Sequence, residues 1–572
     1  MEKRSLLAIT IAFLILILWS WLFKPEKQVP PPQADQPKQA ETATAVTGTG
    51  KADVVQPELG QATQESMVIP ENIQPVMDSE EKEITVENPL CIIKFSNRGG
   101  VVQSWRLKDY LDDEGKPLEL IAPQSKDFNI FPLQIRTDDN ARDAKIHSGL
   151  FVVSTEQGTV KGNAGEDLKG QIVRFRLADE YGLLVEKQLE LPDESYMGSL
   201  QFSVSEAGKS LQSSIVWGSS FGSGGGSANR FYYSGQCVAN IGGKLFRQLS
   251  KNVPDPKSIQ GEIRWAGLDD QYFSTIFIPL SAVDHLDIFP SKRKVENGKE
   301  ESYLNVALPD TEKGYKLFVG PKNYHLLTAA GSNLDQIINF GSWSVIALIA
   351  KGLFISLIWL YNHTIPNYGF GIILITLAIR IIFFPLTQKS FVKMKKMQNQ
   401  MKKIQPKINS IKERYHKKKG DYQAKQKMNQ EIMELYKKEG INPLGGMSGC
   451  LPLLIQLPIL WGFYNVLTIA IELRKAPFVF WIDDLSVKDP YYITPLLMGA
   501  TMLIQQKMSG PAGGDPFQQK MMMFMPLFFT FFFFSFPSGL VLYWLANNVL
   551  GIGQQYLINR EAERLLAATK EQ

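Results

Sequence analysis

Arg380 lies inside an otherwise apolar run, 372–386, whose sequence is IILITLAIRIIFFPL. It precedes the next basic residue, Lys389, by nine positions, which is about 13 Å along a helix. A guanidinium stays charged at physiological pH, and its burial among lipid tails is costly. Two interpretations follow: the long side chain reaches back to the polar interface, or the residue faces a hydrated pocket.

The apolar stretches around Arg380 hold no acidic partner for it. No Asp or Glu occurs in any stretch that we expect to cross a membrane, and the nearest, Glu472, stands at the end of one. An unpaired guanidinium is tolerated beside water, carbonyls or polar side chains, so a hydrated cavity is favoured. Thr376, one helical turn away, shares its face. Other polar candidates, which could equally hydrogen-bond between helices, are Gln456, Asn465, Asn547, Asn548 and Gln554.

These residue types suit the binding of a passing polypeptide better than coupled transport. A positive charge in a cavity attracts an acidic segment, whereas proton- or sodium-coupled transporters usually carry carboxylates inside the membrane. An apolar helix could rest on a nearby hydrophobic wall, although ordinary bundle packing explains the same residues equally well: Leu457, Leu460, Tyr464, Phe524 and Phe528.

The sequence offers little for metal or nucleotide chemistry. Its three cysteines, Cys91, Cys237 and Cys450, form no CxxC pair, so a zinc site is not expected. Cys91 and Cys237 could form a disulfide or remain two unpaired thiols. The glycine-rich segment 221–229 lacks the Gly-Lys-Ser/Thr ending of a phosphate loop and is interpreted as a mobile loop. No cofactor is expected.

An anchored enzyme that acts on sugars is a second alternative. Asp269, Asp270 and Glu262 could supply a pair of catalytic carboxylates. Acidic residues in a β domain more often form a solvated face, which is the interpretation that we favour. The enzyme alternative predicts activity in the isolated segment 80–335.

The amino terminus reads as an uncleaved anchor. Lys3 and Arg4 precede an apolar run that ends in aromatic residues and shows no small-residue cleavage site. Residues 1–23 are therefore predicted to form a transmembrane anchor with its amino end in the cytoplasm.

Two further segments follow outside the cytoplasm. Residues 24–82, rich in Pro, Gln, Ala and Thr, are predicted to be a disordered linker. Between 83 and 335, short alternating segments such as 172–177 and 184–191 are separated by Gly, Asp, Asn and Pro turns. This pattern predicts an antiparallel β-sandwich.

The carboxyl-terminal half holds six apolar stretches, which cannot all cross a membrane. The segment 388–446 carries sixteen Lys or Arg against five Asp or Glu, so the positive-inside rule places it in the cytoplasm. With the anchor leading out and 369–387 leading back, 340–364 is predicted to lie along the outer interface. Residues 449–558 then supply four more transmembrane helices, and 559–572 form a cytoplasmic tail.

The predicted fold is thus a multi-domain membrane protein with six transmembrane helices and an external β-sandwich domain. Two of the crossings, 491–505 and 521–536, span only about 22 to 24 Å against a hydrocarbon core of about 30 Å. Local thinning of the bilayer is expected there.

Two antiparallel helices are predicted within 388–446. Pro406 should kink the first of them near Gln405. Their basic outer faces could attract ribosomal RNA, anionic lipid or acidic passengers, or could serve only to fix the topology. The apolar seam, spaced by three and four residues, consists of Met394, Met397, Met401, Ile404, Ile408, Ile411, Met428, Ile432 and Leu435.

Spaced motifs in this half give a resemblance to a known family. The motifs are Arg380 with Phe384-Pro385-Leu386-Thr387, Asn442-Pro443-Leu444-Gly445-Gly446, Cys450-Leu451-Pro452-Leu453-Leu454-Ile455-Gln456, Phe536-Pro537-Ser538-Gly539-Leu540 and Gln554-Gln555. Together with the layout of the whole chain, they resemble the YidC family of membrane insertases. The resemblance is to the Gram-negative form, which has a large periplasmic domain after the first helix.

The resemblance implies a core of five helices around a hydrophilic groove that opens to the cytoplasm and the inner leaflet. Arg380 and Thr376 match groove residues, Leu457 and Leu460 match client-contacting residues, and Tyr543 with Trp544 matches an aromatic pair in which Trp544 replaces an expected tyrosine. Adding the polar and apolar candidates above, we expect a client-binding set of Arg380, Thr376, Gln456, Leu457, Leu460, Phe524, Phe528, Tyr543 and Trp544.

The resemblance also implies the activity and its partners. Such a protein inserts and helps to fold nascent membrane proteins, alone or with SecYEG and the SecD/SecF complex. It would receive ribosomes through its basic cytoplasmic segments, work in the lipid bilayer without a cofactor, and bind no DNA. The expected location is the bacterial inner membrane, with both termini cytoplasmic and the large domain periplasmic.

Overall fold

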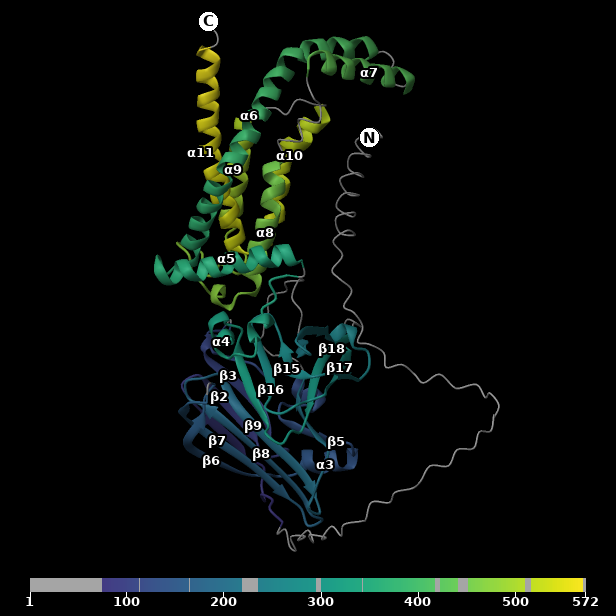
Figure 1. The fold of residues 1–572 in the computed structure, drawn as a ribbon, viewed down its shortest axis with the longest axis vertical. Helices are drawn as coiled ribbons and strands as arrows, with labels where there is room; N and C mark the ends of the chain where they lie inside the picture. Colours follow the sequence, from purple (N-terminus) through teal and green to yellow (C-terminus); the bar gives the residue numbers. More distant parts are fainter. Residues whose placement is uncertain are drawn as a thin grey trace, which may run out of the picture.

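The computed structural model describes residues 75–112, 114–163, 165–218, 235–294, 300–341, 343–416, 422–440, 451–509 and 516–568. The predicted amino-terminal anchor, most of the linker, the segment 221–229 and Cys450 lie outside these residues. The described chain has two parts, a β-rich domain and a set of apolar helices, joined end to end (Figure 1).

The β-rich domain contains three sheets in its described residues, and every strand pair in them is antiparallel. The first sheet has the order β1-β2-β3-β4. The second has the order β13-β12-β15-β16-β19-β9-β8-β7-β6, with β10 paired to β9, and the third has the order β14-β17-β18-β11-β5. The predicted β-rich domain is therefore confirmed.

Some strands, such as residues 183–192 and 197–206, alternate between buried and more exposed residues, whereas residues 273–279 are buried almost throughout. The strands are β1 (Glu83–Glu87), β2 (Cys91–Ser96), β3 (Val101–Leu111), β4 (Pro117–Glu119), β5 (Gln134–Thr137), β6 (Val152–Lys161), β7 (Asp167–Ala178), β8 (Leu183–Pro192), β9 (Met197–Glu206), β10 (Lys209–Ser210), β11 (Ser213–Trp217), β12 (Gln236–Ile241), β13 (Lys244–Leu249), β14 (Lys257–Gln260), β15 (Ile263–Asp269), β16 (Phe273–Pro279), β17 (His285–Lys294), β18 (Glu300–Pro309) and β19 (Tyr315–Pro321). Short helices α2 (Gln124–Phe128), α3 (Asn140–Ser148) and α4 (Tyr324–Ala329) lie among them.

Aromatic side chains join the three sheets into one core. Trp217 of β11 packs against Phe277 of β16, with ring centroids 6.3 Å apart, and against Trp105 of β3, at 6.1 Å. Trp217 and Phe277 are fully buried. Each such ring removes a large apolar area from water, which is the main stabilising contribution of a sheet-on-sheet core.

The predicted linker ends earlier than expected. Val76 pairs with Ala178 at the end of β7, with N–O distances of 2.9 Å in both directions, and the Asp78 N–H donates to the Leu150 carbonyl at 2.9 Å. Residues 75–82 therefore lie against the β-rich domain, contrary to the prediction of a disordered linker up to 82. Backbone pairing to a strand end, which composition does not report, holds them there.

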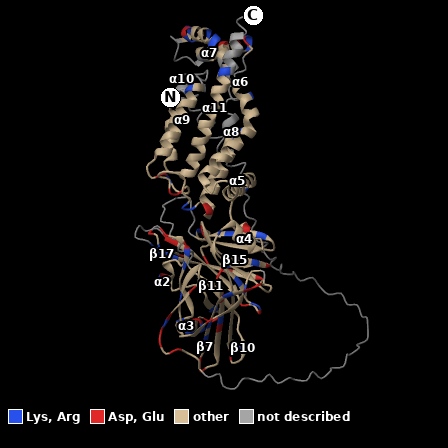
Figure 2. Cartoon of the chain, turned by 90° about the vertical axis from the view of Figure 1, so that its left-hand side faces the viewer, with Lys and Arg blue, Asp and Glu red and all other residues tan. Residues whose placement is uncertain are grey.

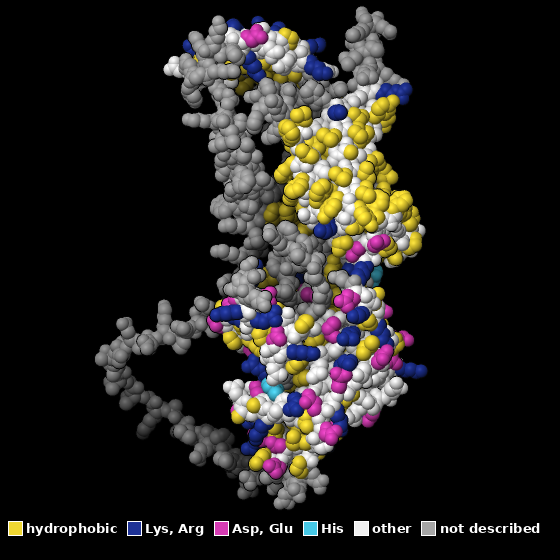
Figure 3. All heavy atoms as spheres, turned by 180° about the vertical axis from the view of Figure 1, so that it is seen from behind, with side chains coloured by type: hydrophobic (Ala, Val, Ile, Leu, Met, Phe, Trp, Pro, Cys, Tyr) yellow, Lys and Arg dark blue, Asp and Glu magenta, His cyan; other side chains and the backbone are white. Residues whose placement is uncertain are grey.

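Besides the polar helix α7 (Tyr422–Lys438), six helices of the described residues follow the β-rich domain. They are α5 (Ser344–His363), α6 (Tyr368–His416), α8 (Leu451–Ile469), α9 (Ile493–Ser509), α10 (Pro516–Phe533) and α11 (Ser538–Ala568). In Figure 1, α6, α8, α9, α10 and α11 run side by side, whereas α5 lies across their end nearest the β-rich domain. Within the bundle these helices carry few charges, in contrast to the β-rich domain and to the end of α6 near α7 (Figure 2). A broad apolar surface covers one side of the bundle (Figure 3).

Only two helices of the described residues are both long and apolar enough to cross a membrane by themselves. These are Ser344–His363 and Tyr368–Val392, and Met523–Phe533 is a shorter apolar helix. The presence of apolar helices is confirmed, while the count of six crossings stays a prediction.

The first helix of the predicted hairpin is a continuation of the preceding one. α6 stays helical through Pro385 and Pro406, and its ribbon bends beyond the bundle where it meets α7 (Tyr422–Lys438) (Figure 1). The two helices share a small apolar cluster of Met401, Ile404 and Ile408 with Met397, Ile432, Leu435 and Tyr436.

The β-rich domain and the helices pack directly against each other. One apolar cluster contains Val238 and Trp265 of the domain, Phe354 of α5 and Phe463 of α8. Around it, the Gln271 side chain donates to the Thr468 carbonyl at 2.7 Å. The domain thus rests on the end of the helical bundle.

Candidate functional site

Arg380 of α6 is held by α11. Its Nε donates to the Asn547 side-chain oxygen at 2.8 Å, and one terminal nitrogen donates to the Asn547 backbone carbonyl at 2.7 Å. The other terminal nitrogen donates to the Gln554 side-chain oxygen at 3.2 Å. All three acceptors are amide oxygens, and no carboxylate of the described chain pairs with Arg380. Amide oxygens satisfy the donors without neutralising the charge.

The hydrogen bonds of Arg380 extend into a wider polar cluster. The Gln554 amide donates to Thr387 Oγ1 of α6 at 2.9 Å, so the two helices are joined twice. Asn548 donates to the Met498 carbonyl at 3.4 Å and to Thr501 Oγ1 at 3.3 Å, which ties α11 to α9. We call Arg380, Thr387, Asn547, Asn548 and Gln554 the polar cluster; all of these except Arg380 are buried.

Gly551 permits this arrangement. It follows Asn547 by one helical turn, so it lies beside the carbonyl that Arg380 reaches. A Cβ built at Gly551 would lie 2.7 Å from an Arg380 terminal nitrogen and 2.7 Å from the Gln505 amide nitrogen. Any side chain there would displace the guanidinium. The sequence prediction missed Gly551 and Thr387; the signal was a helical glycine spaced four residues after Asn547.

Thr376 is not a hydrogen-bond partner of Arg380. The Thr376 hydroxyl donates to the Ile372 carbonyl of its own helix at 2.6 Å, and the residue is buried. Asn465 likewise lies elsewhere, because its amide donates to the Phe340 carbonyl at 2.9 Å. A shared helix face did not bring Thr376 into the polar cluster.

The aromatic pair of α11 is buried. The Tyr543 ring stacks on Phe463 with centroids 4.5 Å apart, and its hydroxyl contacts the Gln456 side chain. Trp544 packs against Phe529 and Phe533 of α10, at 6.0 and 5.2 Å. Both residues hold helices together in this conformation.

The apolar candidates lie on the surface. Leu457 is 43% exposed, Phe524 59% and Phe528 66%, whereas Leu460 is half-buried against the helical core. Trp461, which the sequence prediction did not single out, is 58% exposed one turn after Leu457. These side chains form apolar surface on α8 and α10 and are not part of the polar cluster.

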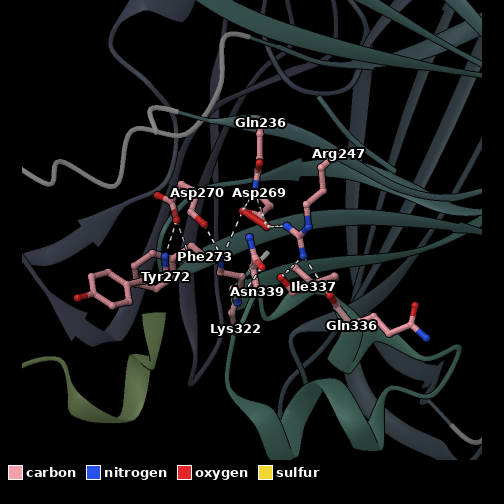
Figure 4. A network of polar contacts seen from close by, with 11 residues as sticks. Gln236, Arg247, Asp269, Asp270, Tyr272, Phe273, Lys322, Gln336, Ile337 and Asn339 are labelled. Atoms are coloured by element: carbon pink, nitrogen blue, oxygen red, sulfur yellow. Dashed lines mark hydrogen bonds and ion pairs between the residues drawn. The ribbon is translucent and has the colours of Figure 1, made fainter. Parts of the chain in front are cut away.

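Two of the three candidate carboxylates, Asp269 and Asp270, are occupied by structural contacts (Figure 4), and the third, Glu262, is exposed and lies 3.4 Å from Arg264. Asp269 is buried, and its oxygens accept from Lys322 Nζ at 3.2 Å, from Arg247 at 3.3 Å and from Gln236 at 3.4 Å. Asp270 accepts from the Tyr272 and Phe273 backbone N–H groups at 2.8 and 2.7 Å. The commitment of Asp269 and Asp270 to these contacts disfavours the enzyme alternative.

Cys91 and Cys237 are both buried free thiols, so the possible disulfide between them is not formed. Burial raises the pKa of the Cys91 thiol to about 12, and burial also raises the pKa of Cys237. Thiols with raised pKa values are poor nucleophiles. Within the described residues, no group of three or more His, Cys, Asp or Glu could hold a metal ion.

Two family profiles match the chain. The profile described as 60Kd inner membrane protein matches residues 359–565, and the profile described as YidC periplasmic domain matches residues 83–356.

Relatives match over nearly the whole length. The chain is 35% identical over 580 residues to the membrane protein insertase YidC of Syntrophus aciditrophicus, covering 98% of this chain and 100% of that one. It is 34% identical over 583 residues to the membrane protein insertase YidC of Geotalea daltonii, covering 98% and 99%. A solved structure of an active YidC insertase with its first transmembrane domain resolved is 17% identical, with a TM-score of 0.36 over 84% of this chain and 94% of that one.

Proposed function

The chain belongs to the YidC family of membrane protein insertases, and we propose that its polar cluster around Arg380 receives the polar flank of a nascent membrane protein during insertion. Insertion, rather than catalysis on a small molecule, is the activity of this family. The observation that carries the proposal is a guanidinium held only by amide oxygens. Its charge is left available to a carboxylate of the client.

The attraction between Arg380 and a client carboxylate is large enough to affect insertion. Two opposite charges 4 Å apart attract by about 4 kcal/mol at an effective dielectric constant of about 20. A client carboxylate would lose much of its hydration on entering a partly enclosed site, and Arg380 would offset part of that cost. Because its own partners are neutral, Arg380 gives up no ion pair when the client arrives.

The exposed apolar residues of α8 and α10 are proposed to contact the client's apolar helix. Leu457, Phe524 and Phe528 present apolar surface that lipid or a client would cover. Transfer of the client helix into lipid then drives its release, at about 25 cal/mol per Å² removed from water. No nucleotide is required for that step.

The proposed membrane arrangement has six crossings, with both termini cytoplasmic. α5 would lie along the outer surface, since a crossing there would carry the basic segment 388–446 to the wrong side. Its orientation across the other helices supports this placement (Figure 1). α9 has 17 residues and would span about 26 Å, which is shorter than a hydrocarbon core of about 30 Å. A locally thinned bilayer would shorten the path of a polar flank.

The basic hairpin formed by the end of α6 and by α7 is proposed to meet the nascent chain and the ribosome. Its charge would favour ribosomal RNA or acidic passengers. Cooperation with SecYEG and the SecD/SecF complex belongs to the same proposal and concerns larger clients.

The proposal is tested by insertion into liposomes that contain only the purified protein. A short two-span client with an acidic translocated tail is scored by protease protection, beside a client with a neutral tail. Arg380→Ala should lower insertion of the acidic client about tenfold or more and that of the neutral client much less. Arg560→Ala, at an exposed position of α11, is the matched control and should leave both unchanged. Equal insertion of both clients by Arg380→Ala would reject the charge role.

A further inference from the structure

A cleft of about 870 Å³ opens over the outer face of the sheet β14-β17-β18-β11-β5, away from the polar cluster. This volume is within the usual range of ligand sites. The cleft is bounded by the ends of β5, β11 and β18, by β17, and by the turn that follows β18.

Small side chains at the middle of this sheet make the hollow. Successive residues of a strand point to opposite faces, so Ile215 and Leu308 face the core while Ser214 and Ala307 face outward. Ser214 pairs with Pro309 on one side and with Arg136 on the other. Because Ser214 and Ala307 carry short side chains, the sheet surface is low at these inner positions.

Carboxylates outnumber the Lys and Arg side chains that line the cleft. Asp287, Asp310 and Glu312 line it, and none of them forms an ion pair among the described residues. The Asp310 carboxyl is half-buried, and this burial raises its pKa to about 6. A desolvated carboxylate of this kind gains most from a donor or a cation.

Two cations, Arg136 and Lys257, also line the cleft. The Arg136 guanidinium lies over the Phe289 ring, 4.5 Å from its centroid, and so is directed to an aromatic face. The fourth acidic residue, Asp138, is already paired with Arg142 at 3.0 Å. Apart from Lys257 on β14, the charges of the lining that form no ion pair within the described chain and lie on no aromatic ring are therefore the carboxylates of Asp287, Asp310 and Glu312.

We propose that this cleft binds an extended polypeptide segment through its lysine or arginine side chains, and that the segment is a translocated part of a client. The ammonium or guanidinium group would lie between Asp310, Glu312 and Asp287. Hydroxyl groups of Ser214 and Ser258 would meet the peptide backbone, while Arg136 at the rim would disfavour a second cation there. The choice of a client as the source of the segment rests on the proposed function. The preference of the cleft for a cationic side chain is argued from its lining residues alone.

The test measures peptide binding to the full-length protein in detergent micelles. The probe is a short fluorescently labelled peptide of Gly, Ser and Lys, and its partner is the same peptide with every lysine acetylated. Anisotropy should show binding of the lysine peptide and at least tenfold weaker binding after acetylation. The double variant Asp310→Asn with Glu312→Gln should lose about as much affinity, and Glu262→Gln, an exposed residue outside the cleft, should lose none.

Two results would overturn the proposal. One is equal binding of the two peptides, and the other is unchanged binding by the double variant. A photo-reactive group on the peptide gives a check that does not depend on variants, because its cross-links must map to the residues lining the cleft. If the peptide fails to bind while the wild-type protein still inserts the two-span client, the cleft proposal falls and the proposed function stands.

Discussion

The approach of Arg380 to α11 depends on Gly551, which has no Cβ atom. Gly551 leaves the Asn547 carbonyl open at the side of the helix, so the guanidinium reaches both the carbonyl and the Asn547 side chain. Gly553, two residues later, has no atom within 4 Å of a Cβ built on it. The two glycines thus form a natural comparison on one helix.

Gly551→Ala should displace the guanidinium and weaken two of its hydrogen bonds, each worth about 1.5–3 kcal/mol because one partner is charged. Insertion of the acidic-tail client should fall about tenfold, as measured by protease protection. Gly553→Ala should be neutral or slightly stabilising, since alanine favours a helix by up to about 1 kcal/mol over glycine. Identical behaviour of the two variants would contradict the role given to Gly551.

Residue-scale prediction from the sequence had a clear limit here. The lack of a carboxylate near Arg380 is evident in the sequence, because the apolar stretches contain no Asp or Glu. Its partners depend on the rotation of α11 against α6, which no local pattern reports. Thr376 was expected on the strength of a shared helix face, yet its hydroxyl bonds to its own backbone.

Lys187 of β8 is fully buried, with backbone carbonyls as its hydrogen-bond partners. Its Nζ donates to the Gly99 and Leu133 carbonyls, both at 3.0 Å, and to the Gly100 carbonyl. Burial lowers the pKa of Lys187 from 10.5 to about 7. Between these values the unfolded chain holds a proton that the folded chain has released. The free energy of unfolding should therefore rise with pH across this window.

The expected rise is at most about 1.4 kcal/mol per pH unit. It should appear in the thermal unfolding midpoint of the full-length protein between pH 7 and pH 8, below the pKa of about 8.5 at which thiols of the unfolded chain begin to ionise. Lys187→Met should remove the rise, since methionine fills similar space without titrating. If the wild type and Lys187→Met show the same pH dependence, Lys187 keeps an ordinary pKa in the folded protein.

At the scale of elements, the sequence predicted the helices well and their ends less well. The long apolar runs of the sequence predicted the helices of the bundle. The end of α6 was not predicted, because this helix continues from the bundle into the hairpin without a break. Pro406 was expected to kink the first hairpin helix near Gln405, and α6 stays helical through both Pro385 and Pro406. The helix continues because a proline costs only one hydrogen bond and neighbouring helices can compensate for it.

The hairpin is held by a small apolar cluster and is therefore sensitive to a single truncation. Ile404 is 3% exposed and belongs to the cluster that joins α6 to α7. Ile404→Ala should cost about 2–4 kcal/mol, which is comparable to the stability of so small a unit. Hydrogen exchange in α7 should accelerate strongly, while exchange in α9 and α11 stays unchanged. Met433→Ala, at an exposed position of α7, is the control, and unchanged exchange in Ile404→Ala would contradict this view of the hairpin.

At the scale of the whole molecule, the two-part organisation could be predicted from composition, but the docking of the parts could not. The contact depends on residues far apart in the sequence, such as Trp265 of β15 and Phe354 of α5. The network of Figure 4 reaches the same apolar cluster through Ile337. Arg247 donates to the Gln336 and Ile337 carbonyls at 3.0 and 2.8 Å, and so fixes the segment that leads into α5.

Asp269→Asn tests whether this network sets the position of the domain on the helices. The substitution leaves Lys322 and Arg247 without their carboxylate, and an uncompensated buried charge costs about 3–5 kcal/mol. Arg247 should then release the Gln336 and Ile337 carbonyls, so that distances between spin labels on the β-rich domain and on α5 become longer and more broadly distributed. Asp269→Asn combined with Lys322→Met should recover part of the wild-type distribution, because one of the stranded charges is removed, and Glu262→Gln should match the wild type. An unchanged distribution in Asp269→Asn would mean that the apolar cluster alone sets the position of the domain.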